Sequence, residues 1–153
     1  KEKLERSLAV EIPAGIDEGT QIRLNGEGDI GENGGSSGTL YVTVNVLPHK
    51  VFKRDGDNIL YELPINFAQA ALGAKVIVPT LYDEVRLKVP AGSQTGKTFH
   101  FKGKGVAHLY RGGRGDQLVR LRVVTPQKLS KEQRRLFDEL AEILDSKKKR
   151  KKP

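Results

Sequence analysis

The chain has 153 residues, of which 37% are hydrophobic and 30% are charged, and this composition is typical of a globular protein with one or two small domains. The absence of cysteine excludes disulfides and thiolate zinc sites. No run approaches the roughly 18 apolar residues that a membrane-spanning helix needs, so we expect a cytoplasmic protein without a membrane partner. The absence of methionine predicts that the chain begins within a longer gene product.

The formal net charge of +8 is concentrated at one end of the chain. Six of the 27 basic residues form the run KKKRKK at 147–152, and the 21 that remain are almost balanced by 19 acidic residues. The body of the protein is therefore close to neutral, and we interpret residues 147–153 as a basic, disordered tail.

The first segments of the chain alternate apolar and polar residues with the period of two that is typical of strands with one buried face. These segments are 8–12, 22–24 and 40–46. Between the last two lies GEGDIG at 26–31, which matches the glycine pattern of phosphate-binding loops. Because strands and no helix flank the hexamer, we interpret it as a backbone bend at Gly26 and Gly28 and not as a nucleotide site.

The middle of the chain predicts a strand with a turn, a short helix and a hairpin. The strand is expected in FKRDGDNILYELPI, with DGDN as its turn. Asn66 with Gln69 three residues later forms a capping box, and Gly73 is a typical C-terminal stop, so we expect a helix from Asn66 to Leu72. The following AKVIVPTLYDEVRLKV predicts a β-hairpin.

One segment of the chain recurs 77 residues later. EIPAGIDEGTQIRLNGEG at 11–28 aligns with KVPAGSQTGKTFHFKGKG at 88–105, and proline, alanine and glycine positions are identical in the two copies. We therefore expect two copies of one β-unit. The first copy lacks the segment that leads into the second copy, so we expect the first unit to be truncated.

After the second copy the apolar period changes to that of a helix. Ser130 with Gln133 forms an N-cap signature, and five apolar residues then fall on one face. They are Leu136, Phe137, Leu140, Ile143 and Leu144. Burying five such side chains contributes on the order of 7–15 kcal/mol, so this apolar stripe needs a partner. Two partners fit the pattern: the β-domain of the same chain and the same helix of a second chain.

No set of residues predicts catalysis. His49, His100 and His108 have none of the spacings of a metal site, and no serine accompanies a histidine and an acid. We interpret the three histidines as structural or solvent-facing. The sequence therefore predicts a binding protein and not an enzyme.

The sequence closely resembles the C-terminal substrate-binding region of DnaJ-type co-chaperones. The resemblance lies in five ordered motifs: VEIPAGIDEGTQIRLNGEGD, LPHKVFKRDGDNILYELPINFAQAALGAKVIVPT, VRLKVPAGSQTGKTFHFKGKGV, RGGRGDQLVRL and TP. It implies a mostly β fold with short helices, in which two tandem similar β-sandwich domains, the first truncated, precede a dimerisation helix. The implied parts are the C-terminal half of a substrate-binding first domain at 1–47, a second domain at 48–127, the dimerisation helix at 128–146 and the tail at 147–153.

The resemblance also implies a function. This region would capture exposed apolar segments of unfolded polypeptides and, in the full-length protein, deliver them to a DnaK-type ATPase chaperone. The implied groove lies in the first domain, where Leu8 and Val42 fall at lining positions and Val10, Leu24 and Phe52 are neighbouring candidates. For each of these five residues, ordinary core packing is the alternative.

The apolar stripe would join two chains into a homodimer. The J-domain and the zinc module of the family do not occur in this chain, so we expect no cofactor here and zinc only in the full-length protein. A competing and less favoured hypothesis is a basic β-module that binds nucleic acid through the lysine-rich tail.

Overall fold

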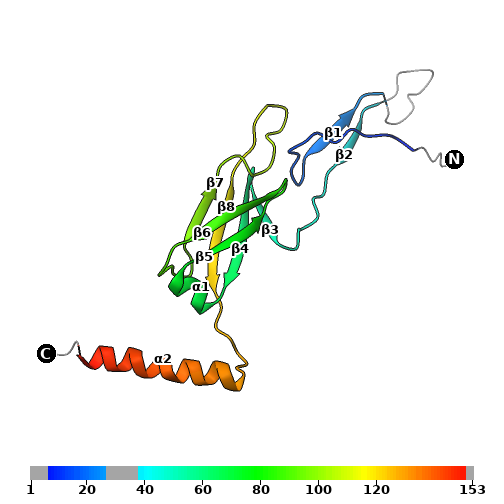
Figure 1. The fold of residues 1–153 in the computed structure, drawn as a ribbon. Helices are drawn as coiled ribbons and strands as arrows, with labels where there is room; N and C mark the ends of the chain where they lie inside the picture. Colours follow the sequence, from blue (N-terminus) through cyan, green and yellow to red (C-terminus); the bar gives the residue numbers. More distant parts are fainter. Residues whose placement is uncertain (1–6, 27–37, 151–153) are drawn as a thin grey trace, which may run out of the picture.

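The computed structural model describes residues 7–26 and 38–150, with side chains up to residue 146. The molecule is elongated: a small β-unit, a larger β-unit and a long helix follow one another (Figure 1). This order agrees with the predicted mostly β fold of two tandem units followed by a helix.

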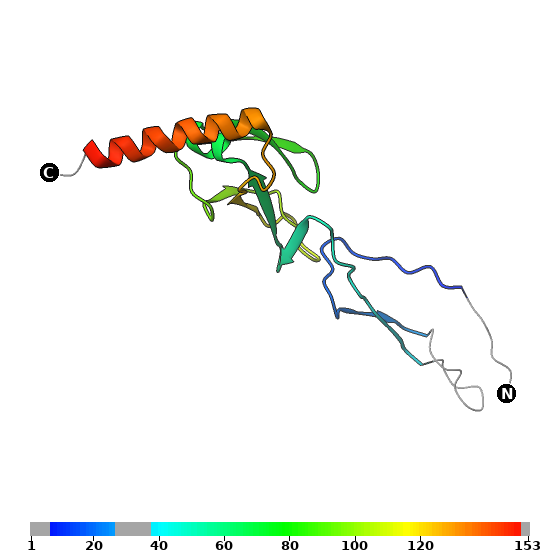
Figure 2. The same cartoon turned by 90° about the horizontal axis from the view of Figure 1, so that it is seen from below.

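The first unit is a pair of antiparallel strands, β1 (Gln21–Leu24) and β2 (Leu40–Thr43). Half-buried and exposed residues alternate along both strands, as the period of two predicts. The expected strand at 8–12 does not form, because no strand of the described residues pairs with this segment. In Figure 2 the segment (dark blue) runs separately and joins the pair only through the turn before β1.

The second unit is a two-layered β-sandwich. Its larger sheet contains β3 (Phe52–Asp55), β4 (Asn58–Ile65), β8 (Gln117–Val123) and β7 (Thr98–Phe101), in that order across the sheet. The smaller layer is the hairpin of β5 (Ala74–Pro79) and β6 (Glu84–Val89). Apolar residues of both layers form one core between them: Leu63, Ile65, Val78, Leu87, Val89, Val119 and Leu121.

The short helix α1 (Phe67–Leu72) begins and ends as predicted. Asn66 accepts a hydrogen bond from the Gln69 backbone N–H at 2.8 Å, and the Gln69 side chain accepts one from the Asn66 N–H at 3.0 Å. Gly73 ends the helix with a φ of 85°. The capping box is therefore complete, and it turns the chain from β4 into β5.

The two units repeat the same backbone pattern. The Gly19 N–H donates to the Val44 carbonyl at 2.9 Å, and 77 residues later the Gly96 N–H donates to the Leu121 carbonyl at 2.7 Å. The register of β1 with β2 also recurs between β7 and β8 with the same shift. The repeat found in the sequence is thus a structural repeat, and β7 with the first part of β8 is the counterpart of the first unit.

The glycine hexamer follows β1, and the next described element is β2. Gly26 has a φ of 78° and its counterpart Gly103 a φ of 74°, which is the left-handed region that favours glycine. These values confirm the predicted bend at Gly26. Gly28 lies outside the described residues.

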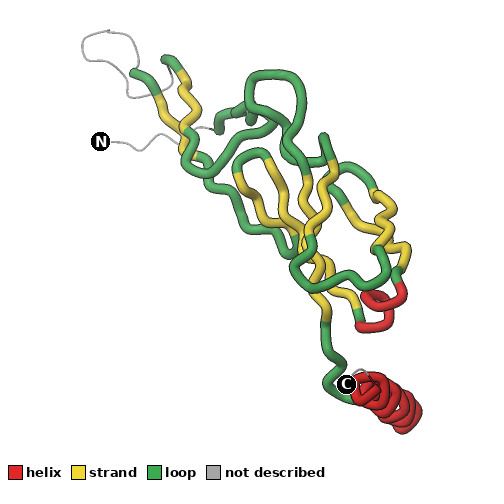
Figure 3. The backbone as a smooth tube through the Cα atoms, turned by 90° about the vertical axis from the view of Figure 1, so that its left-hand side faces the viewer, coloured by secondary structure: helices red, strands yellow, loops and turns green. Residues whose placement is uncertain are grey.

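The long helix α2 spans Lys131–Arg150 and stands apart from the strands (Figure 3). Ser130 and Gln133 form the predicted cap, since each side chain accepts a hydrogen bond from the backbone N–H of the other. The helix continues four residues beyond the expected end at 146, because lysine and arginine have high helix propensity. Neither described helix has the length and apolar character that a membrane-spanning segment requires.

Candidate functional site

Four of the five predicted peptide-binding residues lie in the first unit. Leu8 is 37% exposed, and Val10, Leu24 and Val42 are half-buried. Val42 stands opposite Ile22, and residues two apart along a strand share a face, so Leu24 and Val42 lie on the same face of the β1–β2 pair.

Val10 and Val42 have buried counterparts in the second unit, Leu87 and Val119, whereas Val85 and Phe101, the counterparts of Leu8 and Leu24, are half-buried. Val119, the counterpart of Val42, is 0% exposed, and Val89, the counterpart of Ile12, is 1% exposed, whereas Ile12 itself is 67% exposed. The difference arises because β5 pairs with β6 and completes the second core. No strand of the described residues does the same for the segment before β1. The first unit therefore presents apolar residues that its repeat encloses.

The first unit also presents open strand edges. β1 and β2 form a sheet of two strands, so within the described part of the chain each has one edge without a strand partner. Backbone N–H and C=O groups on such an edge can pair with an additional extended chain. Open edges and uncovered apolar residues thus occur together in the first unit.

Phe52, the fifth predicted binding residue, lies in β3 of the second unit. Its ring contacts those of His49 and Tyr61, with centroids 4.9 Å and 5.7 Å apart. The structure therefore places Phe52 in a small aromatic group on the larger sheet of the second unit, whereas the other four residues lie in the first unit. A binding role for Phe52 stays a prediction.

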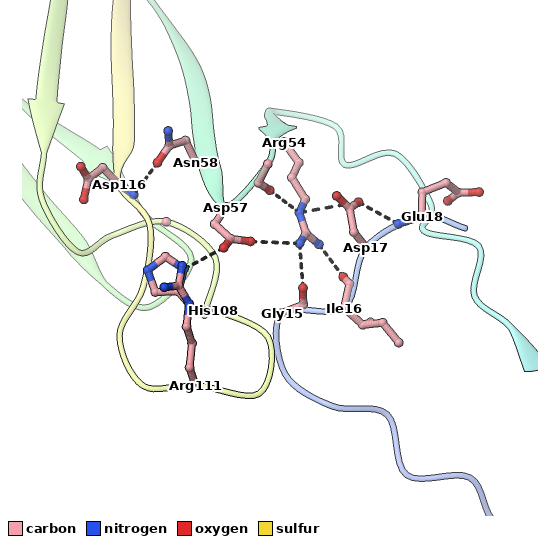
Figure 4. Close-up of polar contacts among 12 residues, drawn as sticks. Gly15, Ile16, Asp17, Glu18, Arg54, Asp57, Asn58, His108, Arg111 and Asp116 are labelled. Carbon is pink, nitrogen blue, oxygen red and sulfur yellow. Dashed lines mark hydrogen bonds and ion pairs between the residues drawn. The ribbon is translucent and has the colours of Figure 1, made fainter. Parts of the chain in front are cut away.

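Arg54 of β3 joins the two units (Figure 4). Its guanidinium donates hydrogen bonds to the carbonyl of Ile16 at 2.6 Å and to that of Gly15 at 2.8 Å, and its Nε lies 3.8 Å from a carboxylate oxygen of Asp17. The planar fork of arginine fits two adjacent acceptors, which a lysine cannot match. Arg54 therefore fixes the turn of the first unit against the second unit.

Asp57 lies on the other side of Arg54 and extends this junction (Figure 4). One carboxylate oxygen lies 3.5 Å from the Arg54 guanidinium, and the other lies 2.7 Å from Nδ1 of His108. The hydrogen bond with His108 is the largest cause of the lowered pKa of Asp57. Burial opposes it, and the charges of His108, Arg54 and Arg111 lower the pKa further. The ionised carboxylate is thus the favoured form at the junction.

The backbones of the two units meet at Gly15. This glycine has a φ of 87°, and a Cβ added to it would lie 2.1 Å from the Ala107 carbonyl oxygen and 2.9 Å from the Leu109 nitrogen. No side chain fits between these backbone atoms. The Pro-Ala-Gly turn of the first unit is therefore packed directly on a loop of the second.

A second histidine–aspartate pair stabilises the start of β8. Asp116 lies 2.5 Å from Nε2 of His100 and accepts a hydrogen bond from the Gly103 N–H at 2.9 Å. The Gly103 bond is the main cause of the lowered pKa of Asp116, with His100 second. Within the described residues no group of three or more histidine or acidic side chains is arranged to hold a metal ion.

The predicted dimerisation residues form an exposed apolar stripe on α2. Four of its five side chains are between 47% and 62% exposed: Leu136, Leu140, Ile143 and Leu144. The fifth, Phe137, is half-buried. Of the two partners that the sequence left open, the β-domain of the same chain does not cover this stripe.

Sequence reasoning missed the junction between the units. Arg54 and Asp57 belong to a segment that predicted a strand and its turn but no contact with the first unit, and His108 was interpreted as structural or solvent-facing without a named partner. The only available signal was the recurrence of Pro-Ala-Gly in both copies, which predicts a turn at Gly15 but not what the turn touches. Contacts between residues 38 and 39 positions apart need a fold before they can be inferred.

Comparison with known proteins agrees with this architecture. Residues 1–126 match the family described as the DnaJ C terminal domain. The chain is 49% identical over 143 residues to the chaperone protein DnaJ of Halalkalibacterium halodurans, which covers 94% of this chain and 39% of that protein. It is 53% identical over 137 residues to the chaperone protein DnaJ of Geobacillus thermodenitrificans, covering 90% of this chain and 36% of that protein.

A third relative, the chaperone protein DnaJ of Parageobacillus thermoglucosidasius, is 52% identical over 141 residues, or 92% of this chain and 37% of that protein. The chain thus spans well under half the length of these curated relatives. Neither the matched family nor the names of these relatives support the nucleic-acid alternative.

Proposed function

This chain belongs to the DnaJ C-terminal domain family, and from that premise we propose that it binds exposed apolar segments of unfolded polypeptides in its first unit. It performs this role as a non-enzymatic chaperone component. The proposal rests on the coincidence of open strand edges with apolar residues, among them Val10 and Val42, whose counterparts in the second unit are buried.

An extended client adds to an open edge of the first unit as a further strand. Its backbone pairs with β1 or β2 independently of sequence, and its alternate side chains reach the apolar residues Leu8, Val10, Leu24 and Val42. Burying two or three client side chains contributes about 3–6 kcal/mol before the cost of ordering the client. Binding is therefore weak and exchangeable, which suits a protein that passes its client on.

Two copies of the chain pair through the apolar stripe of α2. Half-exposed leucine and isoleucine side chains lose contact with water in such a pair, and this supplies the partner that the stripe needs. A dimer holds two weak sites at a high mutual effective concentration, so a long client that engages both sites binds more tightly than to either one.

The remaining parts of the proposal concern the full-length protein. There the client is handed to a DnaK-type ATPase chaperone in the cytoplasm, and zinc is bound by a module outside this chain. Within the described residues, the polar contacts at the junction hold the client-binding unit on the unit that leads to α2. A client captured at one end of the chain is thereby connected to the helix at the other end.

The test is the binding of a fluorescent, uncharged, apolar-rich peptide to the chain, measured by anisotropy. Leu8→Ser and Val42→Ser should weaken binding by roughly a factor of 5 to 30, because each removes about 1–2 kcal/mol of apolar contact. The matched control is Ile77→Ser, which removes an apolar side chain that is 60% exposed on β5 of the second unit.

Binding that is equally weakened by all three substitutions, or by none of them, would contradict the placement of the client in the first unit. Binding that weakens steeply with salt and is lost when residues 147–153 are removed would instead favour the nucleic-acid type of interaction.

A further inference from the structure

The larger sheet of the second unit has one covered and one open face. Along β4 and β8 the residues that face the core alternate with exposed ones, so Glu62 and Pro64 on β4 and Arg120 and Arg122 on β8 point away from the hairpin. Lys53 of β3 stands opposite Leu60 and extends the same outer face. This face has no role in the binding proposed for the first unit.

The outer face is hollowed. A depression of about 380 Å³ lies over β3, β4 and β8 and continues onto the segment that leads into β3. Four cationic side chains line it: Lys50, Lys53, Arg120 and Arg122. One carboxylate, that of Glu62, is also present, and it lies 3.2 Å from the Arg122 guanidinium.

Within the part of the chain that the structure describes, three of the four cations have no counter-ion. Among the described residues, the side chains of Lys50, Lys53 and Arg120 make no hydrogen bond or ion pair, since Glu62 is engaged by Arg122. Cations gathered around one depression repel one another, and a bound anion relieves that repulsion. The depression therefore favours a ligand that carries more than one negative charge.

The remaining lining includes apolar side chains. Val51, Leu60 and Pro64 contribute apolar surface between the cations. A nucleic-acid backbone presents an uninterrupted row of phosphates and would leave this apolar surface unused. An acidic peptide in which apolar residues alternate with carboxylates matches both parts of the lining.

We propose that the outer face of β3, β4 and β8 is a docking site for an acidic, apolar-interrupted peptide segment of a partner protein. The carboxylates of the segment bind Lys50, Lys53 and Arg120, and its apolar side chains rest on Val51, Leu60 and Pro64. This site is separate from the client site proposed above: it lies on another unit and selects by charge.

The experiment measures the anisotropy of a fluorescent ten-residue peptide of alternating glutamate and valine, added to the complete chain in 50 mM salt. The double variant Lys53→Glu with Arg120→Glu should bind the peptide roughly tenfold more weakly or worse, because two attractive charges become repulsive. The double variant Lys53→Gln with Arg120→Gln should show a smaller loss and guards against a folding defect, which circular dichroism checks directly.

The matched control is Lys75→Glu with Lys88→Glu. These two lysines face each other across β5 and β6, are exposed, and carry the same charge change to the other layer of the sandwich. This variant should bind the peptide with an affinity within about twofold of that of the original chain. A second control changes the peptide: with glutamine in place of glutamate, it should bind the original chain at least about tenfold more weakly.

An equal loss of peptide affinity in the Lys53/Arg120 and the Lys75/Lys88 glutamate variants would overturn the proposal. The basic tail is present in both variants and would then explain the binding. Tighter binding of a single-stranded oligonucleotide of the same length, with the same response to Lys53→Glu and Arg120→Glu, would assign the face to nucleic acid and also overturn it. The uncharged apolar peptide that tests the first unit should bind the Lys53→Glu, Arg120→Glu variant as tightly as it binds the original chain. The two proposals therefore succeed or fail separately.

Discussion

Gly15 shows how a single residue sets the distance between the two units. Replacing it with alanine places a Cβ against the backbone of Ala107 and Leu109, so the turn and the loop must separate. Gly19 has a similar φ of 81°, but a Cβ there meets nothing within 4 Å. An alanine at either position meets the same backbone strain, but only an alanine at Gly15 also disrupts the contact between the units. Comparing the two variants therefore isolates the effect of that contact.

We predict that Gly15→Ala raises amide hydrogen exchange at Val106 and His108 by about a factor of ten or more, whereas Gly19→Ala does not. Both variants carry the backbone strain of roughly 1–2 kcal/mol that a non-glycine residue meets in this region. Hydrogen exchange followed by mass spectrometry checks the comparison, and equal exchange in the two variants would show that the units are not docked through Gly15.

Asp57 gives the junction a dependence on acid. Its pKa in the folded protein is lower than the ordinary value of 3.8, with the His108 hydrogen bond as the largest cause. The stability contributed by the ionised carboxylate is therefore fully present above pH 3.8, and it is lost as the pH falls through the lower pKa of the folded state.

We predict that Asp57→Asn lowers the free energy of unfolding at neutral pH and that the difference from the original protein shrinks as the pH falls below 3.8. Denaturant unfolding at a series of pH values measures this difference. The control is Asp55→Asn, which should give a smaller difference. Asp55 is exposed, is separated from Asp57 by Gly56 alone, and has no hydrogen bond or ion pair from its carboxylate in the described structure. A constant difference for Asp57→Asn at every pH would contradict the assignment.

At the scale of elements, local signals in the sequence were sufficient for both helix starts. The pairs Asn66 with Gln69 and Ser130 with Gln133 act within four residues, so their geometry depends little on the rest of the fold. The segment at 8–12 has an equally clear alternation but forms no strand. A strand needs a neighbour to pair with, and alternation alone says nothing about whether that neighbour is present.

We predict that the chain dimerises through the apolar stripe of α2. Leu140→Asp places a charge in the centre of the stripe, where it would lose its hydration in a dimer, so we expect the variant to be monomeric. Arg134→Asp, on the polar side of the same helix, should leave the dimer intact. Light scattering gives the mass of each, and a dimeric mass for Leu140→Asp would show that the stripe is not the interface.

At the scale of the whole molecule, the internal repeat explains both what was predicted and what was not. The two copies differ by a constant shift, so the register of β1 with β2 is the same as that of β7 with β8. The aligned glycines in the sequence predict this correspondence. The way one unit sits on the other has no such template. It depends on the contacts of Arg54 with Gly15 and Ile16, which cross from one unit to the other and therefore have no counterpart in the internal repeat.

Methyl NMR of the chain during titration with an unlabelled apolar peptide locates the client-binding residues directly. If the client binds in the first unit, the methyl signals of Leu8, Val10, Leu24 and Val42 should shift together, while those of the second core, such as Val78 and Leu121, stay in place. Shifts confined to the second core or to Leu136 and Leu140 of α2, with the first unit unchanged, would contradict binding in the first unit.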